Sequence, residues 1–429
     1  MLLSKQNQWF GLVFVITLSM TLTSLTSVFA QEEIVLEVSL HEWHRVVIDT
    51  VQEGVTRFEE ANPGIKVDVR TKGGGWDAFV VRAVAGTPPD ILAFNTFNVA
   101  ELAEAGYLQS LDQFIARTTL ESDIFVPMWE NWIWNGHTYA IPALETGPRI
   151  GLVWNQDMLD ESGISIDPNQ PLTWVEFLNY ADKLTVLDSD DNVVRIGYDP
   201  RNGQNSRLFV LAPLLNAPWL DYETNEPLLD SIEFIDGFEL FVDRIYRKYP
   251  SFQGGGGWYD IAYKTVATTN LGLYAPGEIR NVDPNVKVTV GWPPHAQGLK
   301  TQQLFGWGLG IPVGAKYTEE SMKLIEFLAT DVQFQLDLFA ATGFMSAGAD
   351  FMAELPNHVH DPNILWYINS LAEADEVNSL RPHPIIGKAE GLFNAAVGSI
   401  YSLETPARKA LEEANRLLRA ELVSQGFLD

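Results

Sequence analysis

The stretch Gly136–Leu159, GHTYAIPALETGPRIGLVWNQDML, decides how the chain is divided. It starts with a turn and a strand signal, passes Pro142 and Pro148 without a helical period, and resumes as an apolar run that ends at Trp154. Prolines interrupt strand pairing because they lack a backbone N–H group. We therefore interpret the stretch as a crossing, in which the chain leaves one β-sheet and enters another.

The regions on both sides of this crossing have the composition of folded domains. The chain has 429 residues, of which 46% are apolar, enough for two ordinary domains with a sizeable core. Residues 1–30 are predicted to be a secretory signal peptide, with an apolar run at Phe10–Leu22 and cleavage after Ala30. The alternative is an uncleaved membrane anchor, although this run is shorter than the roughly 20 residues that a spanning helix needs.

The charge and the cysteine content exclude several classes of function. The formal net charge is −28, and such a chain would be repelled by a nucleic acid. There is no cysteine, which excludes disulfides, thiolate metal sites, a cysteine nucleophile and lipid attachment to a cysteine after the signal. We expect a secreted protein that is not a lipoprotein.

The periodicity before the crossing predicts a parallel sheet. Ile34–Leu40 alternates as a strand, Val46–Ala61 has helical spacing, and Ile65–Val69 alternates again. A strand, a helix and a strand in this order form a βαβ unit. Asp90–Phe94 is predicted to be a third, buried strand. The chain before the crossing is therefore expected to fold as an α/β lobe.

The pattern restarts after the crossing. Thr173 and Glu176 form a capping-box signature for a helix that ends at Leu184. Leu187–Tyr198 reads as a hairpin with an aspartate-rich tip. Because no flexible linker marks a boundary, we expect two lobes that are interleaved by several crossings.

Six segments stand out in sequence order: Arg57–Val67, Ala85–Ile91, Tyr139–Pro142, Val153–Asp157, Thr173–Phe177 and Gly306–Pro312. Together they resemble segments of the extracellular solute-binding proteins of ABC importers, in the sugar-binding group that includes maltose-binding proteins. The chain departs from the family pattern at Trp154, where the family often has tyrosine, and at Gly343–Ser346. Both departures bear on the ligand rather than on the fold.

The resemblance implies the type II periplasmic binding protein fold, with two interleaved α/β lobes, three hinge crossings and a ligand cleft between the lobes. We expect the crossings near Ala143, near Pro284–Val290 and near Thr330. The expected lobes are residues 31–143 plus 288–330 and residues 144–287 plus 331–429.

The resemblance also implies a function. It predicts a non-enzymatic, monomeric protein of the periplasm or the cell exterior. This protein would capture a mono- or oligosaccharide without a cofactor and deliver it to the transmembrane permease subunits of an ABC importer.

Four tryptophans are candidate platforms for a sugar ring. Trp76, Trp258 and Trp307 adjoin glycines, where an indole can be presented to a ligand, and Trp43 follows the first strand. A sugar ring has an apolar face that packs on a flat aromatic side chain, and a rim of hydroxyl groups that needs polar partners. The alternative for each tryptophan is core packing, which we expect for Trp174 on its helix face.

The polar partners should come from strand ends and from the crossing, because ligands bind beyond the carboxyl ends of strands in such sheets. The candidates are Glu42, Asp77, Asn95, Thr96, Asn98, Glu145 and Arg149. By resemblance, Glu145 falls at a sugar-contact position, Tyr274 at an aromatic platform and Glu390 at a further ligand position. Arg149 leaves a second possibility open, since it can also pair with a uronate, phosphate or sialate group.

The sequence contains no complete metal-binding or catalytic motif, so we expect neither a metal site nor catalytic residues. His41–His44 lacks the spacing of a helical zinc site. The tip at Asp188 begins like a calcium loop, but Val193 stands where the glycine is required. Two alternatives remain: a secreted glycoside hydrolase with a carboxylate pair, and a binding protein for a polyamine or a glycerophosphodiester.

Overall fold

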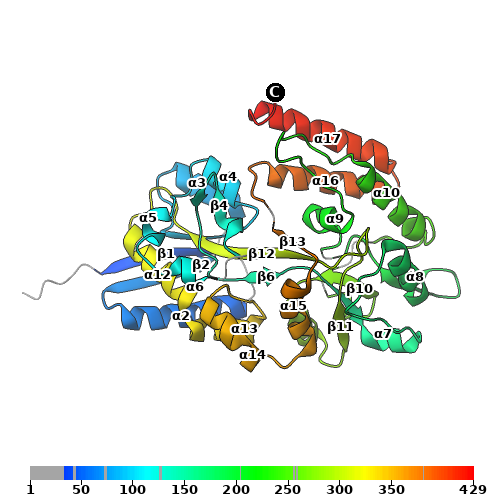
Figure 1. The fold of residues 1–429 in the computed structure, drawn as a ribbon, viewed down its shortest axis with the longest axis horizontal. Helices are drawn as coiled ribbons and strands as arrows, with labels where there is room; N and C mark the ends of the chain where they lie inside the picture. The colour runs from blue at the N-terminus through cyan, green and yellow to red at the C-terminus, as the bar shows by residue number, and fades with distance from the viewer. Residues whose placement is uncertain are drawn as a thin grey trace, which may run out of the picture.

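Two β-sheets form the centres of two lobes that lie side by side (Figure 1). The computed structural model describes residues 33–41, 45–71, 75–124, 128–202, 204–254, 257, 259–379 and 381–429. The predicted signal peptide lies outside the described residues. Among the helices within these ranges, none has the length and apolar character needed to span a membrane.

The first sheet has the strand order β13-β12-β3-β1-β2, with β6 beside β12. As the βαβ pattern predicted, β1 runs parallel to β2, whereas β12 is antiparallel to β3. Its strands are β1 (Ile34–Leu40), β2 (Ile65–Thr71), β3 (Ile91–Asn95), β6 (Thr146–Pro148), β12 (Thr301–Gly310) and β13 (Glu376–Ser379).

Helices surround this sheet, and a small hairpin lies beside α4. The helices are α2 (Arg45–Ala61), α3 (Gly75–Val84), α4 (Val99–Glu104), α5 (Asp112–Ile115), α6 (Leu120–Asp123), α12 (Thr318–Thr330), α13 (Val332–Thr342) and α14 (Ala349–His358). The short 3-10 helix η2 (Glu130–Trp132) precedes the hairpin of β4 (Ile133–Trp134) and β5 (His137–Thr138).

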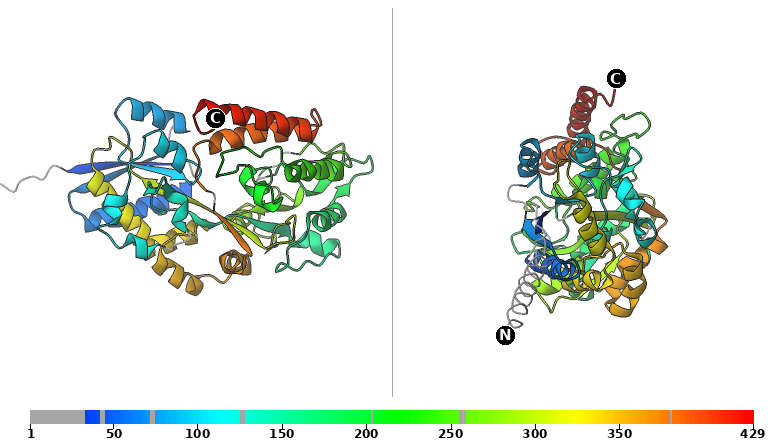
Figure 2. Two further views of the ribbon diagram at one scale, coloured as in Figure 1. Left: turned by 45° about the horizontal axis from the view of Figure 1, so that its top comes forward. Right: turned by 90° about the vertical axis from the view of Figure 1, so that its left-hand side faces the viewer.

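The second sheet has the order β11-β7-β10-β9-β8. Its strands are β7 (Gly151–Asn155), β8 (Val186–Leu187), β9 (Val193–Tyr198), β10 (Val266–Leu271) and β11 (Val288–Gly291). Its helices are α7 (Gln156–Glu161), α8 (Trp174–Leu184), α9 (Leu208–Leu214), α10 (Ile232–Phe241), the π-helical turn η3 (Val242–Tyr246), α11 (Ala275–Val282), α16 (Ile386–Tyr401) and α17 (Ala407–Ser424). The last two pack together along the second lobe (Figure 2). The remaining helix, α15 (Pro362–Glu373), contacts both β6 and β11, at the junction of the lobes.

The stretch Gly136–Leu159 passes from the first sheet to the second. Its strand β6 pairs with β12 of the first sheet, and its strand β7 pairs with β10 and β11 of the second. The change of sheet falls at Arg149 and Ile150, a few residues beyond Ala143. The interpretation of this stretch as a crossing is therefore confirmed.

The other two crossings lie further along the chain than we expected. Val288–Gly291 pairs with β7, so the chain stays in the second lobe until after Gly291 and enters the first at β12. The expected third crossing near Thr330 is wrong because α13 packs on α2, where Phe334 contacts Gly54. The chain reaches the second lobe's helices only after β13, which pairs with β12.

Local predictions in the second lobe are confirmed. Trp174 is 4% exposed and packs edge-on against Phe241. Thr173 and Glu176 form both hydrogen bonds of the capping box. Asp188 accepts hydrogen bonds from the backbone N–H groups at the tip of the β8–β9 hairpin, so its carboxylate closes a turn.

In the second half of β12 alternate residues are glycines, so one face of the strand has no side chains there. The crossing segment packs closely against this face. A Cβ atom at Gly308 would stand 2.8 Å from the carbonyl oxygen of Ile141 and 2.9 Å from the indole of Trp132. At Gly310 it would stand 2.6 Å from the carbonyl oxygen of Tyr139. The side chains between these glycines, including that of Trp307, point to the opposite face of the strand.

Gly308→Ala is expected to lower the free energy of unfolding by about 1–3 kcal/mol, because the added methyl group overpacks a close backbone contact. Urea unfolding measures this change. Gly398→Ala is the matched control, since nothing lies within 4 Å of a Cβ there. In the middle of α16 it should raise stability by about 0.5–1 kcal/mol. Equal stability of the two variants would contradict the close packing of β12.

Candidate functional site

A cavity of about 540 Å³ lies between the lobes. Both lobes and the crossing line it, and its size falls within the range of small-molecule sites. Its polar and aromatic lining residues are His41, Asn95, Phe97, Glu145, Arg149, Arg207, Tyr259, Tyr274, Glu278, Phe305, Trp307, Thr342 and Phe344.

The ends of the first-lobe strands build one wall. Trp307 on β12 pairs with Asn95, the last residue of β3, and its indole stacks on the His41 ring at 4.6 Å between centroids. Phe305 precedes Trp307 by two residues, so both side chains leave the strand on the same face. The first lobe therefore offers an aromatic surface at the carboxyl ends of β1 and β3, where such sheets bind ligands.

The second lobe supplies a more polar wall. The Tyr274 hydroxyl accepts a hydrogen bond from Nε2 of Gln204 at 2.7 Å. The Tyr259 hydroxyl donates to Glu278 at 3.2 Å. Arg207 lies 3.4 Å from a carboxylate oxygen of Glu390. These pairs hold several polar side chains in defined positions around the cavity.

Glu145 occupies the crossing itself. Its carbonyl oxygen accepts a hydrogen bond from the backbone N–H of Trp307 at 2.6 Å, which ties the crossing to β12. Burial raises the pKa of the half-buried Glu145 carboxyl to about 7, and the nearby Arg149 guanidinium opposes this rise only in part. Within the described part of the chain, no group donates a hydrogen bond to this carboxyl. It is therefore available to a ligand.

Arg149 places its guanidinium group over two aromatic rings. Its guanidinium carbon is 3.8 Å from the centroid of Phe305 and 5.9 Å from that of Phe97. Phe97 in turn stacks on Phe209 of the second lobe at 4.4 Å. Burial lowers the pKa of the Arg149 guanidinium. A cation on aromatic faces thus marks the point where the two lobes meet.

The structure brings five of the predicted site residues together at this cavity. They are Asn95, Glu145, Arg149, Tyr274 and Trp307. Glu390 stands behind them and pairs with Arg207, which lines the cavity.

The remaining predictions fall into two groups. Thr96 and Asn98 do not line the cavity: Thr96 is 1% exposed, with its backbone bonded to Gly306, and Asn98 is the N-cap residue before α4. Glu42, Trp43 and Trp258 lie outside the described residues, as do the side chains of Trp76 and Asp77 in α3.

Sequence reasoning missed several lining residues. Phe97 lies within the loop that supplied the other first-lobe candidates, and Phe305 shares the β12 face of Trp307, so both carried a usable signal. Phe344 lies in Gly343–Ser346, where the chain departs from the family pattern, so it too carried a signal. No local motif marks the second-lobe residues Arg207, Tyr259 and Glu278.

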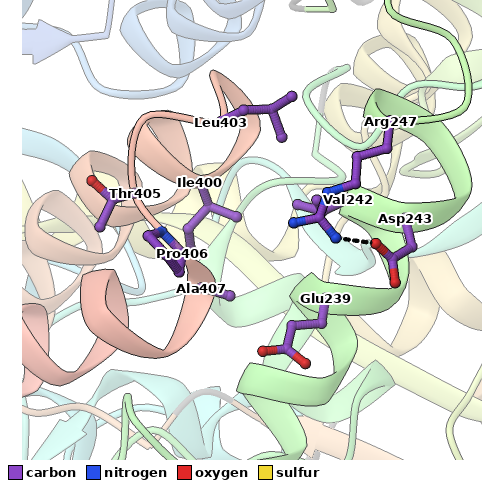
Figure 3. A pocket seen from close by; sticks show the side chains of 9 residues that line it. All are labelled: Glu239, Val242, Asp243, Arg247, Ile400, Leu403, Thr405, Pro406 and Ala407. Atoms are coloured by element: carbon purple, nitrogen blue, oxygen red, sulfur yellow. Dashed lines mark hydrogen bonds and ion pairs between the residues drawn. The ribbon is translucent and has the colours of Figure 1, made fainter.

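A second hollow, of about 510 Å³, lies within the second lobe (Figure 3). It sits between the η3 turn and the loop that joins α16 to α17, and its charged side chains include the ion pair of Arg247 with Asp243. None of the predicted site residues lines it. Among the described residues, no group of three or more His, Asp or Glu side chains is placed to hold a metal ion.

Comparisons with known proteins agree with this architecture. A family model described as bacterial extracellular solute-binding protein matches residues 46–333. The maltotriose-binding protein of Pyrococcus abyssi (strain GE5 / Orsay) is 26% identical over 217 residues, which is 48% of this chain and 42% of that protein. The match thus spans less than half of the curated relative's length.

Solved structures with the same fold cover nearly the whole chain. CpMnBP1 with mannotriose bound has a TM-score of 0.79 and 20% identity, over 90% of this chain and 100% of that one. A solute-binding protein of an ABC transporter from Thermotoga lettingae TMO, bound with alpha-D-tagatose, has a TM-score of 0.76 and 21% identity, over 91% and 100%. At these identities the likeness shows the fold, two α/β lobes around a cleft.

Proposed function

Because the chain belongs to the family of bacterial extracellular solute-binding proteins, we propose that it captures a mono- or oligosaccharide between its lobes and delivers it to the permease of an ABC importer. The observation that supports this ligand class best is the lining of the cavity between the lobes. Aromatic faces from the first lobe stand opposite polar side chains from the second.

This pairing suits the chemistry of a sugar ring. The apolar face of the ring can pack on Trp307 and Phe305, while hydroxyl groups on its rim meet Glu145, Tyr274 and Glu278. Carboxylate oxygens accept hydrogen bonds from two hydroxyl groups at once. The maltotriose-binding relative and the mannotriose-bound neighbour support the same ligand class.

Lobe closure follows from ligand contacts with both walls. A ligand shifts the equilibrium between open and closed lobes only by the difference in its affinity for the two states. A sugar that touches Trp307 on one lobe and Tyr274 on the other binds the closed state better. The closed form then presents the sugar to the permease. This role needs no catalytic step, and the protein acts as a monomer in the periplasm or outside the cell.

Isothermal titration with a saccharide panel tests the proposal. Mannotriose, maltotriose and tagatose are suitable first ligands, and we expect at least one sugar of the panel to bind with a micromolar Kd, equivalent to about −8 kcal/mol. The saccharide should be recovered intact after prolonged incubation. New reducing ends would indicate a glycoside hydrolase instead, and the absence of binding across the panel would contradict the proposal.

A further inference from the structure

We infer that the saccharide of this cavity carries a carboxylate group and that Arg149 binds it. The inference rests on the proposed function and narrows its ligand from carbohydrates in general to acidic ones, such as oligosaccharides that contain uronic acids. It follows from the surroundings of Arg149.

The guanidinium group of Arg149 has unmet hydrogen-bonding capacity. It carries five N–H donors and no acceptor. Within the described ranges, its side chain donates no hydrogen bond and forms no ion pair; it lies over the rings of Phe305 and Phe97, and the charge of Glu145 acts on it without direct contact. A half-buried arginine with a structural role uses its donors on carbonyl or carboxylate oxygens of the protein. The donors of Arg149 are instead left for a group that enters the cavity.

The protein nevertheless holds this guanidinium in a fixed place. The backbone N–H of Arg149 bonds to the carbonyl oxygen of Gln303 on β12 at 2.8 Å. The guanidinium carbon lies 3.8 Å from the centroid of the Phe305 ring, and an aromatic ring takes up none of the N–H donors in a conventional hydrogen bond. A planar guanidinium that is fixed on an aromatic ring matches the two oxygens of a carboxylate.

The other charges of the cavity explain why a singly charged anion fits. Arg207 is already paired with Glu390 at 3.4 Å. Glu278 accepts a hydrogen bond from Tyr259, and burial raises the pKa of Glu145 to about 7, so its carboxyl is partly protonated near neutral pH. Arg149 is thus the one cationic side chain of the described lining that lacks both an ion pair and a hydrogen bond. A phosphate dianion would bring one more negative charge beside Glu145 and Glu278 than a carboxylate does, so the singly charged anion meets less repulsion while it still pairs with Arg149.

Matched pairs of ligands test the inference. Trisaccharides of mannuronic, galacturonic and glucuronic acid are titrated beside the neutral trisaccharides of the same linkage, and beside a sugar phosphate. We expect one uronate to bind about 10- to 100-fold more tightly than its neutral counterpart, as charge-assisted hydrogen bonds allow. Arg149→Met should abolish this preference, because it should weaken binding of the uronate far more than binding of the neutral trisaccharide.

Two further variants separate the effect of the guanidinium shape from the effect of net charge. Arg149→Lys retains the charge but loses the planar fork, and should reduce the preference about tenfold. Arg408→Met, on the exposed side of α17, makes the same change in net charge away from the cavity and should leave the preference intact. Melting curves establish that each variant is folded.

The outcomes separate the inference from the proposed function. If neutral trisaccharides bind as tightly as uronates, and Arg149→Met changes neither, the inference is wrong while saccharide binding stands. Preferential binding of the sugar phosphate would also overturn it. If no saccharide of either kind binds, the proposed function fails as well.

Discussion

Replacing Trp307 with alanine is expected to lower the free energy of unfolding by about 3–5 kcal/mol, because the indole is 7% exposed and packs within the main core. The same change should weaken saccharide binding at least tenfold, about 1.4 kcal/mol, because Trp307 and His41 form the stacked aromatic wall of the cavity. Urea unfolding and isothermal titration measure the two effects separately.

Trp307→Phe is the control for the two roles of this side chain. It retains an aromatic face but fills less volume, so it should recover most of the binding while still losing part of the stability. If Trp307→Ala unfolds the protein at the temperature of the titration, the saccharide affinity of the phenylalanine variant still tests whether this side chain contributes to binding. Unchanged affinity in a folded Trp307→Ala protein would remove this residue from the site.

Glu145→Gln is expected to change how stability depends on pH. Burial raises the pKa of the Glu145 carboxyl to about 7 in the folded protein, against about 4.3 in an unfolded chain. The folded state therefore binds the proton more tightly, and its contribution to stability is present below the unfolded pKa and lost as the pH rises through about 7. Glutamine mimics the neutral acid and does not suffer this loss.

The variant and the wild type should therefore be similar in stability near pH 4, diverge as the pH rises from about 4.3 to about 7, and remain apart at pH 8. The expected gain of the variant at pH 8 is about 1–3 kcal/mol, reduced from the full linkage value because the side chain retains some contact with solvent. Unfolding in urea at several pH values gives the difference curve. Exposed Glu404→Gln controls for the change in net charge. Parallel curves for Glu145→Gln and the wild type would show that this carboxyl is not desolvated.

Binding gives a second measure of Glu145. Its carboxyl faces the cavity without a hydrogen bond from the described residues, so the glutamine variant should bind a saccharide less tightly. A loss of affinity without a loss of stability at pH 5 would show that Glu145 serves the ligand rather than the fold.

The first crossing was predictable from the sequence because its signals are local. Pro148 ends one strand, and the apolar run after Ile150 begins another in a different sheet. The third crossing was not predictable in this way. Asp331 caps α13 directly after α12, which resembles a boundary between lobes. The lobe that α13 joins is decided by the contact of Phe334 with Gly54, far upstream in the chain.

The site residues also divide into those with a local sequence signal and those without one. Asn95 at the end of β3 and Glu145 on the crossing were predictable because the fold class places such positions at a cleft. Trp307, within β12, was predictable because it adjoins glycines. Arg207 and Glu278 were not, because they come from a loop and a helix of the second lobe with no distinctive motif. Thr96 was misplaced because a one-residue step after β3 turns the side chain from the cavity into the core.

The position of β12 in the first sheet sets the order in which the lobes can be completed during synthesis. β12 pairs residue 307 with residue 95, so the first sheet lacks the strand that links β3 to β6 and β13 until the ribosome has passed Gly310. All strands of the second sheet lie between Gly151 and Gly291. The later lobe therefore has its whole sheet available first. The earlier residues must wait for a distant partner, and pairings of such long range form slowly.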